Sequence, residues 1–143
     1  MSKRLVPRWA RLWIWFFPAK PPTRPPVLER PRPRPVGEKV VLRAERDGVD
    51  SRFLDAWLDQ YGDLHIDGQD LGPGTAMVSS DGEYEWFRTF RAAEVPGVVE
   101  ALGGEPGQDV MAFLAGMWAG RGNELETRLR EAGLRGEIDV WSG

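Results

Sequence analysis

The chain contains no cysteine and only one histidine, His65. Without cysteine there is no disulfide, no thiolate-bound metal and no cysteine nucleophile. One histidine cannot form a histidine cluster around a metal, and a Ser-His-Asp triad would depend on His65 without any feature that predicts an oxyanion hole. The absence of cysteine fits a cytoplasmic protein.

The sequence also lacks the short motifs that bind phosphate or zinc or carry a serine nucleophile: G-x-x-x-x-G-K-[ST], G-x-G-x-x-G, H-E-x-x-H and G-x-S-x-G. Asp67-Gly-Gln-Asp70 resembles part of a calcium loop but lacks its roughly twelve-residue spacing. A hydrolase with two carboxylates needs a cleft and an acid kept neutral by burial, and the sequence shows neither. We therefore expect a protein that is not an enzyme and that binds no cofactor or metal.

The N-terminal segment has no apolar run long enough to cross a membrane. Leu12–Phe17 has six residues, whereas a spanning helix needs roughly 20. Arg11 interrupts the apolar pattern, Pro18 ends it, and no small-residue cleavage site follows closely, so a signal peptide is not favoured.

Lysine is absent beyond Lys39, and the charges of the chain divide at the same point. Residues 1–39 hold ten Lys/Arg and two Asp/Glu, whereas residues 40–143 hold nine Arg and twenty Asp/Glu. Such a split is typical of a basic arm attached to an acidic body. We expect a basic, aromatic and proline-rich arm over 1–39 and an acidic α+β domain over 40–143 that is large enough for one core.

The arm has nine of the twelve prolines. Because proline fixes φ and removes an N–H donor, we expect the arm to be extended or disordered. Three interpretations stay open: an anchor at an anionic membrane surface or assembly, a contact with nucleic acid, which is less favoured, and a disordered leader or even the product of an upstream start-codon error. The candidate anchor residues are Trp9, Trp13, Trp15, Phe16 and Phe17.

The first part of the body predicts strands. Val40–Asp47 alternates, with Val40, Leu42 and Ala44 on the buried side. Phe53–Asp59 fits either an amphipathic helix or a strand, and we favour the strand because Asp63–Leu71 is a natural partner. Between them, Gln60-Tyr61-Gly62 fits a three-residue hairpin loop with a left-handed glycine.

The hairpin register follows from that loop. It places Asp59 opposite Asp63, Trp57 opposite His65 and Asp55 opposite Asp67, with the leucines and Ile66 on the buried side. Glu83–Arg91 predicts a further strand on which Tyr84, Trp86, Arg88 and Phe90 share one face.

Three helices are predicted next, over Glu94–Leu102, Gln108–Ala119 and Asn123–Ala132. The second begins near Asp109. The third has Asn123 as its N-cap and Glu126 in a capping box. The expected buried stripes contain Val110, Phe113, Leu114, Met117 and Trp118 in the second helix, and Leu125, Leu129 and Ala132 in the third. With Glu137–Trp141 as a short returning strand, the fold class is α+β: an antiparallel sheet of three to four strands with three C-terminal helices packed on one face.

An acidic face on the hairpin is the strongest functional signal. Like charges opposite each other are destabilising, so something must neutralise them. Three candidates stay open: a ladder with Arg43, Arg88 or Arg91, a basic protein partner with Trp57 and Trp86 as aromatic anchors, and a Ca²⁺ or Mg²⁺ ion. His65 is expected to form a surface pair with Trp57. The candidate partner-binding residues are Asp55, Trp57, Asp59, Asp63, His65, Asp67, Glu83 and Glu85.

Three segments, GDLHIDGQDLGPG at 62–74, EYEW at 83–86 and LGGEPGQDV at 102–110, carry a resemblance. Residues 40–143 resemble a group of uncharacterised small acidic α+β proteins of high-GC bacteria, some of which are similar to immunity proteins that neutralise a toxin by binding it. The resemblance implies no catalytic residue. It implies a non-enzymatic protein-binding module whose basic partner is a toxin, and the alternative is a peripheral protein tethered through the arm to an anionic membrane surface.

Overall fold

The computed structural model describes residues 30–73 and 82–142. The chain divides into two compact units, residues 1–31 and 32–143. Only Arg30 and Pro31 of the first unit are described, so the candidate anchor residues of the arm lie outside the described residues. The second unit holds the helices and strands that are described.

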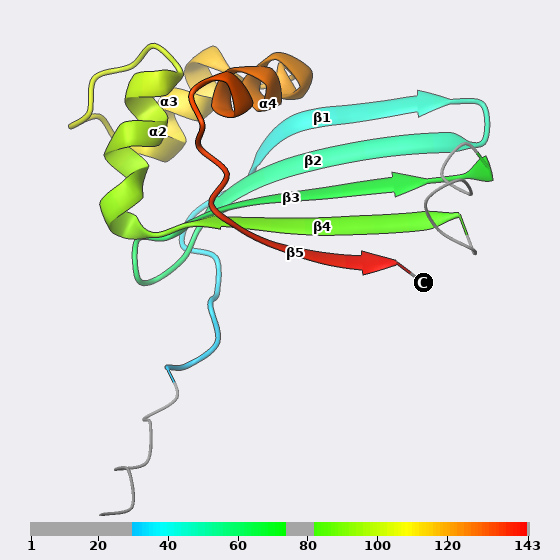
Figure 1. Ribbon diagram of the computed structural model, residues 1–143, viewed down its shortest axis with the longest axis horizontal. Coiled ribbons are helices and arrows are strands. Elements are labelled where there is room, and N and C mark those ends of the chain that lie inside the picture. Colours follow the sequence, from blue (N-terminus) through cyan, green and yellow to red (C-terminus); the bar gives the residue numbers. More distant parts are fainter. Residues whose placement is uncertain (1–29, 74–81, 143) are drawn as a thin grey trace, which may run out of the picture. The chain divides into compact units, whose positions relative to one another are not determined.

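Five antiparallel strands form one sheet in the order β1-β2-β3-β4-β5, and the helical segments lie between β4 and β5 in the chain. The α+β class is confirmed, but the sheet has five strands rather than three or four, because both Val40–Asp47 and Glu137–Ser142 pair with the central strands. Figure 1 shows the helices gathered at one end of the sheet. The strands are β1 Val40–Asp47, β2 Asp50–Leu58, β3 Leu64–Leu71, β4 Glu83–Phe90 and β5 Glu137–Ser142.

The β2–β3 hairpin has the predicted register. Trp57 pairs with His65 and Asp55 with Asp67, and the Asp59 amide donates to the Asp63 carbonyl at 3.0 Å. Gly62 has φ 82°, a left-handed conformation that favours glycine. The strand interpretation of Phe53–Asp59 is therefore confirmed over the helical one.

A β-bulge in β1 changes which side chains reach the core. Val41 pairs with Asp55 but Arg43 pairs with Leu54, so Leu42 is an extra residue between them. The bulge reverses the alternation beyond it. Arg43, predicted to face outward, is buried at 6% exposure, whereas Ala44, predicted to be buried, is exposed.

The helical segments are η3 Ala92–Glu94, α2 Val95–Ala101, α3 Val110–Met117 and α4 Gly122–Glu131. As expected, Asp109 lies at the start of α3, where its side chain caps the helix by accepting from the Ala112 amide at 2.9 Å. The predicted capping box on α4 is wrong: Arg121 is its N-cap, and Asn123 lies inside the helix, where its Oδ1 accepts from Arg43 Nη1 at 2.6 Å.

One hydrophobic core joins the strands to the helices. Met117 and Ala132, predicted to be buried, are exposed, because both lie where their helices end. The core residues from the strands are Val40, Leu42, Leu54, Ala56, Leu64, Ile66 and Phe90. Those from the helices and the segments that join them are Val98, Val99, Leu102, Val110, Phe113, Leu114, Trp118, Leu125 and Leu129.

The segment before β1 also belongs to this unit. The Val36 amide donates to the Leu58 carbonyl at 2.8 Å, and the Gln60 side chain bonds the backbone of Arg32 and Arg34. Hydrogen-bonded structure therefore begins before Val40. Among the described helices, none is long and apolar enough to cross a membrane.

Candidate functional site

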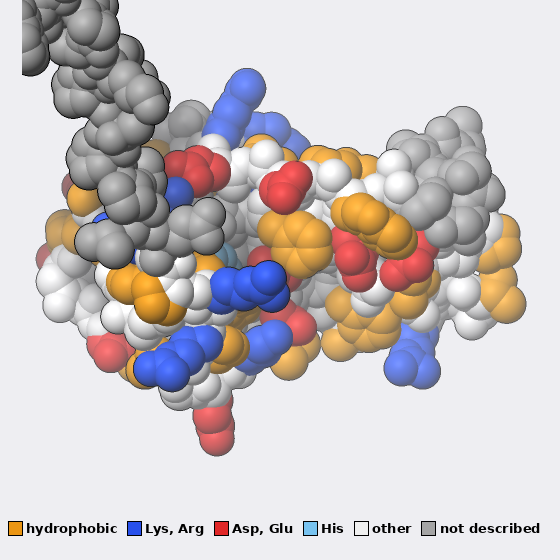
Figure 2. All heavy atoms as spheres, turned by 90° about the horizontal axis from the view of Figure 1, so that it is seen from below, with side chains coloured by type: hydrophobic (Ala, Val, Ile, Leu, Met, Phe, Trp, Pro, Cys, Tyr) orange, Lys and Arg blue, Asp and Glu red, His pale blue; other side chains and the backbone are white. Residues whose placement is uncertain are grey.

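The face of the sheet that points away from the core carries most of the predicted site residues. Residues paired across antiparallel strands share a face, so the pairings define this outer face. In β2 and β3 it includes Phe53, Asp55, Trp57, His65, Asp67 and Gln69, and in β4 and β5 it includes Glu83, Glu85, Phe87, Thr89, Glu137, Asp139 and Trp141. Figure 2 shows acidic and hydrophobic side chains lying next to one another across one face of the molecule.

His65 does pair with Trp57, but the pair is not a surface feature. The two rings stack with centroids 3.9 Å apart, and His65 is only 8% exposed. His65 Nε2 lies 2.8 Å from Asp59 Oδ2, and its Nδ1 lies 3.2 Å from Thr89 Oγ1. Both ring nitrogens therefore have partners inside the protein, and His65 is a structural residue.

Asp59 organises the hairpin loop from a buried position, with 2% exposure. Its Oδ1 accepts from the Tyr61 amide at 2.8 Å and from the Asp63 amide at 3.0 Å, and its Oδ2 contacts His65. Burial alone raises the pKa of Asp59, but the hydrogen bonds from His65, Asp63 and Tyr61 outweigh it and lower the pKa below the usual value.

Asp63 is also buried, with 4% exposure, and it has partners. Its Oδ1 accepts from the Ala92 amide at 2.7 Å, and its Oδ2 lies 3.2 Å from Arg91 Nη1. Arg91 also contacts Glu137 at 2.9 Å, and its hydrogen bonds to Glu137 and Asp63 raise the pKa of Arg91. Of the three arginines predicted to form a ladder, Arg91 is the one that pairs with carboxylates of this face, Asp63 and Glu137.

The other two predicted ladder residues, Arg43 and Arg88, lie on the opposite face. The bulge turns Arg43 inward, and Arg88 pairs with Ile66 on the core side. The carboxylates over the middle of the outer face are thus not neutralised by these arginines.

Neutral donors hold three half-buried carboxylates of the outer face in place. Trp57 Nε1 donates to Asp67 Oδ2 at 2.7 Å, and Gln69 Nε2 donates to Glu83 and Glu85 at 3.1 and 2.8 Å. Partial burial raises the pKa of Asp67, the hydrogen bond from Trp57 and the electrostatic effects of His65 and Lys39 oppose this rise, and the nearby Asp55 adds a smaller increase. The charge of Asp67 is therefore only partly compensated.

One row across the outer face concentrates the uncompensated charge. Asp55 pairs with Asp67, Asp67 with Phe87 and Phe87 with Asp139, so three carboxylates and one aromatic ring lie side by side. We call these four residues the acidic row. Among the described residues, Asp55 has no hydrogen-bond or ion-pair partner for its side chain.

Two exposed aromatic residues lie in or beside this row, and neither was predicted as an anchor. Phe87 is 39% exposed and Trp141 49% exposed. Trp86, predicted as an anchor at the acidic patch, lies on the opposite face over Gly68. Sequence reasoning missed Trp141 because its placement depends on β5 pairing with β4, which a short C-terminal segment only weakly predicts.

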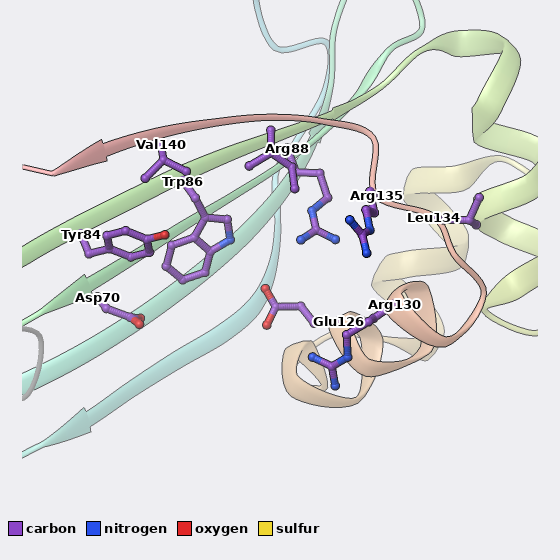
Figure 3. A pocket seen from close by; sticks show the side chains of 10 residues that line it. Asp70, Tyr84, Trp86, Arg88, Glu126, Arg130, Leu134, Arg135 and Val140 are labelled. Atoms are coloured by element: carbon purple, nitrogen blue, oxygen red, sulfur yellow. The ribbon is translucent and has the colours of Figure 1, made fainter. Parts of the chain in front are cut away.

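A groove lies on the opposite face of the sheet, between β4 and α4, with a volume of about 470 Å³. Figure 3 shows Tyr84 and Trp86 on one side, Glu126 and Arg130 on α4, and Arg135 in the segment before β5. Asp70 and Arg88 also line it. Of these residues only Trp86, as a partner anchor, and Arg88, as a ladder residue, were singled out from the sequence, and both were assigned to the acidic face. The groove was missed because its residues come from β3, β4, α4 and the segment before β5 and meet only in the fold.

Within the described ranges, no group of three or more acidic or histidine side chains could hold a metal ion. No protein-family model, curated protein or solved structure matches this chain. The resemblance to immunity proteins therefore stays a prediction.

Proposed function

We propose that this chain is a non-enzymatic binding protein that holds a basic protein partner against the outer face of its sheet. The acidic row carries the proposal: Asp55 and Asp67 are directly paired, Asp139 follows on the other side of Phe87, and the row contains no arginine or lysine. Adjacent like charges cost the fold about 0.2–1 kcal/mol per pair, and a bound cationic surface offsets that cost.

The aromatic residues around the row supply the apolar part of the interface. Binding energy at protein interfaces concentrates in aromatic and arginine anchors that are surrounded by polar contacts. Phe87 within the row and Trp141 beside it are exposed. On the other side of the row, the Trp57 ring stacks on His65 with centroids 3.9 Å apart. Arginine side chains of a partner can pair with the carboxylates and stack on these rings.

The resemblance to immunity proteins supports a narrower version, in which the basic partner is a toxin that is inactive while bound. Asp59, Asp63 and His65, predicted as contacts, support the surface from beneath instead. The proposed contact residues are Asp55, Trp57, Asp67, Glu83, Glu85, Phe87, Asp139 and Trp141.

Affinity capture from the host with charge-matched variants tests the proposal. The row variant is Asp55→Asn/Asp67→Asn/Asp139→Asn. The control is Glu100→Gln/Glu105→Gln/Glu131→Gln, which removes the same charge from exposed positions outside the sheet. A basic protein retained by the wild type and the control, lost by the row variant and released by salt supports the proposal. Equal recovery on all three proteins, or no basic protein on any of them, rejects it.

A further inference from the structure

Arginine is concentrated at the groove. Residues 40–143 contain nine arginines, and four of them, Arg43, Arg88, Arg130 and Arg135, line the groove or lie beside it. Two carboxylates, Asp70 and Glu126, lie with them. An acidic body therefore carries one site with an excess of positive charge.

Arg43 lies within ion-pair distance of both carboxylates, Asp70 and Glu126. Its Nη1 lies 3.5 Å from Glu126 Oε2 and 2.6 Å from Asn123 Oδ1, and its Nη2 lies 3.9 Å from Asp70 Oδ1. Among the described residues, no hydrogen bond or ion pair joins the side chains of Arg88, Arg130 or Arg135 to another residue. Figure 3 shows the guanidinium groups of Arg88 and Arg135 pointing toward one another.

The two unpaired guanidinium groups of Arg88 and Arg135, which lie near one another in the groove, fit an anion. Arginine presents a planar fork of donors that matches phosphate in a bidentate manner. The volume of the groove falls in the range of small-molecule sites, roughly 300–1,000 Å³. Arg88 and Arg135 come from β4 and from the segment before β5, so a single phosphate group can be approached from two sides, whereas the Arg130 guanidinium points away from them along α4 (Figure 3).

An aromatic wall lies next to the arginines. Trp86 and Tyr84 have ring centroids 5.6 Å apart. A Cβ at Gly68 would come within 2.1 Å of the Trp86 ring, so the indole lies directly on the β3 backbone because Gly68 has no side chain. The ring is thereby fixed against the sheet while it lines the groove, a suitable platform for a planar ring.

One buried acceptor remains unused. Asp70 Oδ1 is buried and has no hydrogen-bond partner, since Arg43 Nη2 is too distant at 3.9 Å. Buried polar atoms without partners are rare in folded proteins. Oδ1 itself has almost no exposed area, but the Asp70 side chain is 27% exposed and lines the groove, so its carboxylate can accept from an amino or hydroxyl group of a ligand.

We propose that this groove binds a mononucleotide, with the base on Trp86 and Tyr84, a base amino group or ribose hydroxyl at Asp70, and the phosphate at Arg88 and Arg135. This site lies on the face opposite the acidic row, and it does not depend on the partner proposed above. The ligand needs all three chemical parts, so a phosphate alone or a nucleoside alone should bind more weakly than the whole nucleotide.

Isothermal titration of the full chain with AMP, GMP, CMP and UMP tests the proposal. Inorganic phosphate and adenosine probe the separate parts of a nucleotide, and N-acetyltryptophan is a control ligand that carries an aromatic ring and a carboxylate. At least one nucleotide should bind at least 10-fold more tightly than any of the three. Arg88→Gln and Arg135→Gln should each weaken that nucleotide about 10-fold or more, because each removes a charge-assisted hydrogen bond. Arg46→Gln, a change on the outer face, should leave affinity unchanged, and so should the row variant.

Thermal melting of each variant shows whether it is folded at the titration temperature. Absence of binding by every nucleotide up to millimolar concentration overturns the proposal. So does phosphate or N-acetyltryptophan binding as tightly as the nucleotides, because the site would then be a simple phosphate site or a carboxylate site. Equal weakening by Arg46→Gln also overturns it, because it would indicate a general charge effect.

Discussion

The outer face and the groove are built from the same strands and have opposite character. In β3, Asp67 and Gln69 point outward while Gly68 and Asp70 point to the groove side. In β4, Phe87 points outward while Trp86 and Arg88 line the groove. Carboxylates outside are held by neutral donors, whereas several arginines in the groove have no partner among the described residues.

Successive side chains of a β-strand point to opposite faces of the sheet, so one strand can contribute to two surfaces of different character. Two sequence neighbours such as Phe87 and Arg88 contribute to different surfaces, so a partner and a ligand of opposite charge can bind without competing for contacts. A substitution on one face should therefore affect that surface and leave the other unchanged.

Asp59→Ala should give the largest effect, because it removes the support beneath the outer face. The Tyr61 and Asp63 amides and His65 lose their acceptor, and each buried group left unpaired costs about 1–3 kcal/mol. Urea denaturation should show a loss of about 3 kcal/mol. Asp109→Ala, which removes one exposed helix cap, should cost only about 1 kcal/mol. Equal losses in the two variants would contradict the structural role of Asp59.

The pH dependence of the free energy of unfolding should reflect the ionisation of Asp59. The pKa of Asp59 is lower in the folded than in the unfolded protein. Its contribution to stability is therefore present above about pH 4, the unfolded value, and is lost as the pH falls through the folded value. The stability difference between the wild type and Asp59→Asn should shrink on acidification below pH 4. A difference that stays constant from pH 6 to pH 2 would contradict this.

Gly68→Ala should disrupt the groove while leaving the outer face in place. The added Cβ would meet the Trp86 ring at 2.1 Å and displace it, at a cost of about 1–3 kcal/mol. The affinity for the nucleotide should fall because the Trp86 ring is displaced, whereas capture of the basic partner should be unchanged.

Gly116→Ala is the matched control for that change. Nothing lies within 4 Å of a Cβ at this position inside α3, and alanine favours a helix over glycine, so thermal melting should show a gain of about 0.5–1 kcal/mol. A loss in Gly116→Ala, or no loss in Gly68→Ala, would contradict the packing described for Trp86.

Asp67→Asn should change the free energy of unfolding least of these variants, and it should raise rather than lower it. Because partial burial and Asp55 raise the pKa of Asp67, its ionisation weakens the fold as the pH rises through that pKa. The asparagine oxygen can still accept from Trp57, so stability at pH 7 should be unchanged or higher by less than about 1 kcal/mol. A clear loss in urea denaturation would show that the row stabilises the fold.

The sequence predicted the β2–β3 hairpin well, because a short loop with Gly62 in the left-handed conformation sets the register of both strands. The same register brought Asp55 beside Asp67. Local signals also predicted β1, β4 and the three helices within a few residues.

Other features were missed because they depend on contacts between distant segments. The bulge at Leu42 turns Arg43 inward, where it meets Asn123 and Glu126 of α4. Asp59 and Asp63 look like surface residues in an acidic sequence, and only the His65 ring, the Arg91 guanidinium and nearby amides make their burial favourable. The groove gathers arginines from β4, α4 and the segment before β5, and no periodicity of the sequence predicts that.

Partner capture on face-specific variants tests the central claim, that two faces of one sheet serve separate binding events. The row variant Asp55→Asn/Asp67→Asn/Asp139→Asn and the groove variant Arg88→Gln/Arg135→Gln are compared with the wild type in the same capture experiment. The structure predicts that the basic partner is lost only with the row variant. Loss of the partner from the groove variant, or equal retention by both variants, would contradict the account.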